Sequence, residues 1–131
     1  MKKYILFIPL LALSSCNAWK HSSSFQYEEL MVADYEQKMT NTSDAIIVDV
    51  RTNKEYTKSH IQNAINISYF GGDIKKYIDT LDKNKPVFIY CQTQHRSPLT
   101  AKIMKKKGFK QVIDLKGGFM KWEKENKPMV K

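Results

Sequence analysis

Apolar residues in this chain occur in short runs, separated by stretches in which apolar and polar residues alternate with helical spacing. Residues 45–50, 86–90 and 111–115 are nearly continuous apolar runs rich in β-branched side chains. Such runs predict parallel strands that are covered on both faces, because a strand buried between two layers needs no polar face. Shorter extended segments are expected at residues 27–30 and 64–67.

Helical spacing follows most of these predicted strands. The predicted helices span residues 32–39, 53–58, 73–81 (with Asp73 as a candidate N-cap), 98–107 and 119–125. Alternation of strands and helices predicts an α/β fold, a three-layer sandwich with a mostly parallel central sheet of about five strands. With 131 residues, of which 42% are hydrophobic, the chain has enough apolar surface for one domain.

The first residues have the order of features that is typical of an export signal. Lys2 and Lys3 precede an apolar stretch at residues 4–13, and the small residues Ser14 and Ser15 come directly before Cys16. The segment LSSC resembles the lipobox of bacterial lipoproteins, which implies cleavage before Cys16 and lipidation of its sulfur. An uncleaved signal-anchor helix is the alternative, although the apolar stretch is shorter than the roughly 20 residues that span a bilayer.

The lipobox resemblance divides the chain into three parts: a signal peptide at residues 1–15, the lipidated Cys16 with a serine-rich flexible tether at residues 16–25, and a folded domain at residues 26–131. It implies a protein that is lipid-anchored in a bacterial cell envelope, at the outer membrane or on the periplasmic side if there are two membranes. We expect no nucleic-acid partner despite the net charge of +9, because an exported protein seldom meets nucleic acid and the lysines are scattered.

The chain has two cysteines, Cys16 and Cys91. If Cys16 carries a lipid, Cys91 has no partner for an intramolecular disulfide, and a lone thiol in an oxidising compartment is either buried and inert or retained for its reactivity. A disulfide between the two cysteines of a non-lipidated chain is the alternative, and it leaves the lipobox unexplained.

Cys91 directly follows the predicted strand at residues 86–90, where ligands bind in open α/β sheets. Ser97 is a candidate N-cap for the next helix, and Pro98 suits the first helical position. The positive end of that helix and the charge of Arg96 both favour an anion, and therefore a reactive thiolate at Cys91. From the spacing alone, a buried inert cysteine and a solvated arginine are equally consistent with the pattern.

Three segments, in this order, resemble rhodanese-like domains. They are IIVDVRTNKEYTKSHIQNAINI, with Asp49, Arg51, Glu55 and His60 at motif positions; VFIYCQTQHRS, which is similar to the family's active-site strand and loop; and DLKGGFMKW, which matches its closing Gly117-Gly118 and Trp122 element. The resemblance covers about residues 27–130.

The resemblance implies a thiosulfate sulfurtransferase-like enzyme. Cys91 would take a sulfane sulfur from a donor such as thiosulfate, become a persulfide, and pass the outer sulfur to a thiol or cyanide-type acceptor. The backbone amides of Gln92, Thr93, Gln94, His95 and Arg96 would surround the sulfur, and Arg96, together with His95, would attract the anionic donor. Neither a metal nor an organic cofactor is implied, and we expect a monomer.

Other motif residues receive supporting roles. Asp49 and Arg51 are expected to form an ion pair that anchors neighbouring loops, His60 to be a structural histidine, and Trp122 to pack the last helix on the sheet. Residues 53–58 are expected to form a solvent-exposed helix.

Two features of the loop bear on activity. Four residues separate Cys91 from Arg96, and the longer loop of cysteine-dependent phosphatases makes that class a poorer match. Gln94 stands where many family members have glycine, so a positive φ there would cost roughly 1 kcal/mol in strain. This departure leaves a second hypothesis open, in which the domain is an envelope interaction or sulfur-relay module with little turnover of its own.

Overall fold

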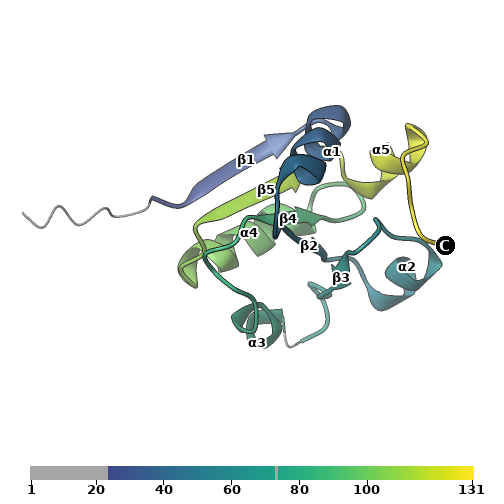
Figure 1. Cartoon of the computed structure of the whole chain (residues 1–131). Coiled ribbons are helices and arrows are strands. Elements are labelled where there is room, and N and C mark those ends of the chain that lie inside the picture. The colour runs from purple at the N-terminus through teal and green to yellow at the C-terminus, as the bar shows by residue number, and fades with distance from the viewer. Residues whose placement is uncertain (1–23, 73) are drawn as a thin grey trace, which may run out of the picture.

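The computed structural model describes residues 24–72 and 74–131. Five parallel strands form one sheet in the order β1-β5-β4-β2-β3 (Figure 1). Their bounds are β1 Gln26–Leu30, β2 Ile46–Asp49, β3 Ile65–Asn66, β4 Val87–Tyr90 and β5 Gln111–Leu115. The predicted α/β fold with a parallel central sheet is confirmed.

Helices connect the strands and cover both faces of the sheet (Figure 1). Their bounds are α1 Val32–Asn41, α2 Asn53–Lys58, α3 Ile74–Asp79, α4 Arg96–Lys106 and α5 Gly118–Lys124. Each described strand and helix was predicted from the sequence with ends within two residues of those observed, because hydrophobic periodicity identifies elements more reliably than it identifies their ends. The proposed N-cap Asp73 lies outside the described residues.

Two apolar clusters, one on each face of the sheet, form the three layers. Helices α3 and α4 contribute Ile78, Ala101 and Met104 to one cluster. Helices α1 and α5 contribute Tyr35 and Trp122 to the other. The predicted packing role of Trp122 is confirmed, since its ring is buried and meets that of Tyr35 edge-on, with ring centroids 6.3 Å apart.

Strand β4 lies in the middle of the sheet, between β5 and β2, and all four of its residues are buried. From β1 at one edge of the sheet, the chain continues to β2 and to β3 at the other edge. It then returns, and β4 and β5 lie between β2 and β1. Strand order therefore reverses beside β4, and such a reversal leaves a crevice at the carboxyl end of the central strands. Cys91 follows β4 at that end.

The residue before β1 also contacts the apolar core. Phe25, which was assigned to the tether, packs against the cluster on the α4 side and lies 5.9 Å below the ammonium of Lys105. The signal peptide at residues 1–15 and Cys16 lie outside the described residues. Within residues 24–72 and 74–131, none of the helices has the length and apolar character needed to cross a membrane.

Candidate active site

Cys91 lies at the carboxyl end of β4 with 1% of its surface exposed, and it forms no disulfide with another described residue. The Ser97 hydroxyl donates a hydrogen bond to its sulfur, with 3.6 Å between Oγ and Sγ. We call residues 92–96 the cysteine loop, because they connect Cys91 to the body of α4.

The first turn of α4 begins within the cysteine loop, which corrects one prediction. The helix starts at Arg96 with His95 in the N-cap position, so Ser97 is not the cap, and its side chain bonds to the sulfur. Pro98 is accommodated in this first turn because N–H groups there have no helical partner. The displacement of the helix start brings the Ser97 hydroxyl to Cys91.

The start of α5 fixes the cysteine loop from the other side. The Phe119 N–H donates to the Cys91 carbonyl at 2.8 Å, and the Met120 N–H donates to the Gln92 carbonyl at 3.1 Å. Gly118 permits this approach, since a Cβ there would lie 2.6 Å from the Cys91 oxygen and 2.5 Å from the Gln92 oxygen. The carbonyls of Cys91 and Gln92, in the first two peptide units after the cysteine, therefore point toward α5.

The backbone N–H groups of the cysteine loop have no acceptor in the part of the chain that the structure describes. Among residues 24–72 and 74–131, no group accepts a hydrogen bond from the amides of residues 92–96. Consecutive free amides beside a helix N-terminus form an anion-binding concavity. The loop can therefore hold a negatively charged sulfur next to Cys91.

Gln94 has the left-handed backbone conformation that is expected at a position where many family members have glycine. Its φ is 66°, in the left-handed region, and the same holds for Asn63, with φ of 64°. The sequence did not reveal what the Gln94 side chain does: its Oε1 accepts a hydrogen bond from the Gly117 N–H at 2.9 Å. Gln94 therefore ties the cysteine loop to the turn that precedes α5, a bond that glycine cannot make.

Arg96 is held by a carboxylate from α2. Its two terminal nitrogens donate to Glu55 at 2.9 and 3.0 Å, and its guanidinium lies 5.7 Å from the ring centroid of Phe70. Glu55 also accepts from the Thr52 N–H and completes the capping box of α2. The hydrogen bonds from Arg96 lower the pKa of Glu55 to about 2, and those to Glu55, with a smaller contribution from Cys91, raise the pKa of Arg96. Glu55 is thus part of the site and does not simply face solvent.

Asp49 and Arg51 form the expected ion pair, with Nη2 and Oδ2 2.6 Å apart and both side chains buried. Arg51 also donates to the Ser59 carbonyl at 2.6 Å and to Gln92 Oε1 at 3.1 Å, and lies 3.9 Å from the centroid of the Phe119 ring. This cation connects β2, the cysteine loop and α5, so its supporting role extends to the loop itself.

The other predicted residues, Thr93, His95 and His60, have hydrogen-bond partners other than Cys91. Thr93 and His95 are exposed and share a hydrogen bond of 2.9 Å between Oγ1 and Nδ1. His60 has the expected structural role, because Nδ1 lies 3.0 Å from the Tyr56 carbonyl oxygen and the two rings stack 3.9 Å apart.

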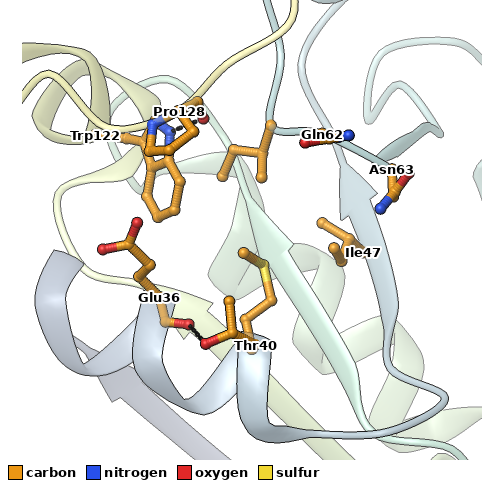
Figure 2. A pocket seen from close by; sticks show the side chains of 9 residues that line it. Glu36, Thr40, Ile47, Gln62, Asn63, Trp122 and Pro128 are labelled. Atoms are coloured by element: carbon orange, nitrogen blue, oxygen red, sulfur yellow. Dashed lines mark hydrogen bonds between the residues drawn. The ribbon is translucent and has the colours of Figure 1, made fainter.

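A hollow of about 260 Å³ opens beside the cysteine loop, lined by Arg51, Glu55, Lys58, Ser59, Gln92, Phe119 and Glu123. A second hollow, of about 280 Å³, lies between α1, α5 and the segment after α2 (Figure 2). Trp122 and Pro128 border it, and none of the predicted site residues lines it. Of these two hollows, only the one beside the loop is lined by a residue of the cysteine loop, Gln92.

Comparison with known proteins assigns the family. A family model of the rhodanese-like domain matches residues 31–125. The chain belongs to the rhodanese-like domain family. It is 35% identical over 86 residues to the thiosulfate sulfurtransferase GlpE of Coxiella burnetii, covering 66% of this chain and 78% of that protein.

Two Bacillus subtilis relatives match over more of this rhodanese-like domain. It is 33% identical to the candidate sulfurtransferase YtwF over 103 residues, covering 79% of this chain and 97% of YtwF. It is also 33% identical over 105 residues to the candidate sulfur carrier YrkF, covering 79% of this chain but 56% of YrkF.

Solved structures agree with this fold. A rhodanese-related protein from Thermoplasma volcanium superimposes with a TM-score of 0.70 at 24% identity, over 79% of this chain and 98% of that one. A Rhodopseudomonas palustris protein of unknown function, described as a candidate tyrosine phosphatase, gives a TM-score of 0.68 at 28% identity, over 82% of this chain and 86% of that one.

Sequence reasoning missed Asp114 in this rhodanese-like domain. It lies fully buried in β5, and its carboxylate accepts a hydrogen bond from the Tyr27 hydroxyl at 2.9 Å. An acidic residue inside an otherwise apolar strand was the available signal. In the described part of the chain, no group of three or more His, Cys, Asp and Glu side chains is arranged to hold a metal ion.

Replacement of Gln94 separates its strained backbone from its side-chain bond. We expect Gln94→Ala to lower the free energy of unfolding by about 1–2 kcal/mol, because it loses the bond to Gly117 and keeps a Cβ at positive φ. Gln94→Gly should recover about 1 kcal/mol of that loss. Urea unfolding of the parent and the two variants measures both contributions, the hydrogen bond to Gly117 and the strain of a Cβ at positive φ. Equal stability of the Ala and Gly variants would show that residue 94 is not strained.

Gly118→Ala tests the approach of α5 to the cysteine loop. The added Cβ would overlap two backbone oxygens at a residue whose φ is +67°, so the loop and α5 must separate. We expect a loss of about 2–4 kcal/mol in the free energy of unfolding, and faster alkylation of Cys91 in the native state because the thiol becomes accessible. Gly72→Ala is the matched control, since it also replaces a glycine of positive φ but has no atom within 4 Å of the added Cβ. A similar loss in both variants would contradict a specific role for the α5 contact.

Proposed function

We propose that this rhodanese-like domain transfers sulfane sulfur from an anionic donor such as thiosulfate to a thiophilic acceptor, through a persulfide on Cys91. The observation that carries the proposal is a thiol at the carboxyl end of the central strand that pairs with no described cysteine, beside five consecutive loop amides that have no acceptor among residues 24–72 and 74–131. The similarity to GlpE, a thiosulfate sulfurtransferase, supports the choice of donor.

The reaction consists of two displacements at sulfur. The Cys91 thiolate attacks the outer sulfur of thiosulfate, the S–S bond of the donor breaks, and sulfite leaves with the electron pair. The loop amides then stabilise the negative outer sulfur of the persulfide. A thiolate or cyanide attacks that sulfur, and Cys91 departs as the thiolate with which the cycle began.

Arg96 would attract the anionic donor toward the loop, but its guanidinium already forms an ion pair with Glu55. The guanidinium is already bound by both carboxylate oxygens, so a donor must compete for it. Together with the 1% exposure of Cys91, this pairing favours slow turnover with small donors. It is the specific observation that supports the second candidate, a sulfur-relay module that receives sulfur from a protein, and the similarity to the candidate sulfur carrier YrkF agrees with it.

We also propose that the domain is tethered to a bacterial envelope membrane through a lipid on Cys16. The support is the order of basic, apolar and small residues before that cysteine. The domain would then face the envelope space, within reach of sulfur compounds outside the cytoplasm.

Intact mass spectrometry after incubation with thiosulfate tests sulfur transfer. We expect the full chain to gain one sulfur on Cys91, and cyanide to remove it with release of thiocyanate. Cys91→Ser should gain none, and Cys16→Ser should behave as the parent, which excludes the other cysteine as the acceptor. If the parent acquires no sulfur from thiosulfate but accepts it from a persulfidated protein, the relay function replaces the enzymatic one. A gain that persists in Cys91→Ser would refute the assignment of the nucleophile.

Processing of the amino terminus tests the anchor. We expect the protein made in a bacterial host to partition into detergent, and Cys16→Ala to accumulate as an unprocessed precursor, because cleavage requires the lipidated cysteine. Ser15→Ala is the matched control, since a small residue is retained before the cysteine. Recovery of native protein with a disulfide between Cys16 and Cys91 would contradict both the anchor and the free thiol.

A further inference from the structure

The helices on the two faces of the sheet differ in charge. On one face, α3 and α4 contain six basic residues and one acidic residue, Asp79. On the other face, α1 and α5 contain three basic and three acidic residues. Among these four helices, the excess of positive charge therefore lies entirely on the side of α3 and α4.

Most of these cations are exposed and are not neutralised by a neighbouring carboxylate. Asp79 already forms ion pairs with Lys83 and with Lys107, the C-cap residue of α4. Five other lysines of α3 and α4 are exposed and form no ion pair within residues 24–72 and 74–131. We call these five the lysine face: Lys75 and Lys76 of α3, and Lys102, Lys105 and Lys106 of α4. Such a surface attracts an extended anionic partner.

On α4 the lysine face includes an exposed apolar side chain. Leu99, Lys102 and Lys106 follow one another at spacings of three and four residues, so they share one stripe of the helix. The Leu99 side chain is 42% exposed. Lysines next to an exposed apolar residue are typical of a helix that lies on a membrane surface.

A hollow of about 400 Å³ between β1 and α4 adjoins the lysine face. Lys102 and Lys105 line it together with the aromatic residues Phe25 and Tyr27. Glu29 lines it as well, and its carboxylate accepts a hydrogen bond from the Tyr27 hydroxyl at 3.1 Å. Tyrosine beside lysine is a combination that suits the headgroup region of a bilayer.

The chain enters the domain on this same side. Phe25 packs against the cluster to which α4 contributes Ala101 and Met104, and its ring centroid is 5.9 Å from the Lys105 ammonium. Eight residues lie between Cys16 and Phe25, and even a fully extended chain of this length spans no more than about 30 Å. A lipid on Cys16 would therefore hold the lysine face close to the bilayer.

We propose that the lysine face docks on the headgroups of an anionic lipid bilayer. The proposal rests on the proposed anchor only for the nearness of that bilayer, since the charge and exposure of the face are independent of Cys16. Each lysine at an anionic surface strengthens binding about fivefold, and salt screens the attraction. The hollow beside the cysteine loop is lined by no residue of α3 or α4, so docking leaves it uncovered.

Vesicle sedimentation tests the docking with the full chain carrying Cys16→Ser, which has no lipid. We expect tighter binding to vesicles that contain phosphatidylglycerol than to vesicles of phosphatidylcholine alone. Adding Lys102→Gln and Lys106→Gln should weaken binding to the anionic vesicles about 25-fold. Lys116→Gln with Lys124→Gln is the matched control, because it removes the same charge from exposed positions outside the lysine face; we expect it to change binding less than about twofold.

Two results of this experiment would overturn the proposal. One is a parent without preference for the anionic vesicles, and the other is an equal loss in the two double variants, which would show that binding follows net charge. Residues 1–15 are the same in all of these proteins, so their own affinity for lipid cancels in the comparison. Because none of the proteins carries a lipid, the result does not depend on the anchor, and failure to partition into detergent would refute the anchor alone.

Amine acylation of the processed lipoprotein on vesicles measures its orientation. With phosphatidylglycerol present, Lys102 and Lys106 should react several-fold more slowly than on phosphatidylcholine alone, whereas Lys116 and Lys124 should react at the same rate on both. Peptide mass spectrometry follows each lysine, and NaCl at about 0.5 M should remove the difference because it screens exposed charges. Equal rates for Lys102 and Lys106 on the two kinds of vesicle, or slower reaction of Lys116 and Lys124 instead, would contradict docking through the lysine face.

Discussion

The contact between the first turn of α5 and the carbonyls of Cys91 and Gln92 is the constraint on which the site depends. Two backbone hydrogen bonds, from Phe119 and Met120, turn these carbonyls toward α5. The cysteine loop amides remain without acceptors among the described residues. Only glycine at position 118 allows so close an approach of two backbones. The orientation of these carbonyls therefore leaves the loop amides available to an anion beside Cys91.

Two arginines, each paired with a carboxylate, stabilise the backbone of the cysteine loop. Arg51 connects Asp49 with Gln92, and Arg96 is held by Glu55, whose own backbone partner is the start of α2. The contacts of Arg51 with Gln92 and of Arg96 with Glu55 each join residues 41 positions apart in the sequence. Their main effect is on the shape and electrostatics of the loop, and the pairing of Arg96 moderates its attraction for an anionic donor.

The sequence predicted the strands, the helices and the position of Cys91 because these depend on local periodicity and on the order of motifs. It also indicated the strained backbone at Gln94, since a residue in a glycine position implies a positive φ. It could not indicate that Gln94 reaches Gly117, that Glu55 binds Arg96 or that Ser97 faces the sulfur. Those contacts depend on how separate segments meet in space. Asp114 was visible as the acidic residue in an apolar strand, but its hydrogen bond with Tyr27 required the pairing of β1 with β5.

A crystal structure of the domain after exposure to thiosulfate tests most directly whether the cysteine loop holds a transferred sulfur. The account predicts one additional sulfur bonded to Cys91 Sγ, with several amide nitrogens of residues 92–96 within about 3.5 Å of it. A persulfide directed away from these amides, or loop carbonyls turned toward the sulfur, would contradict it.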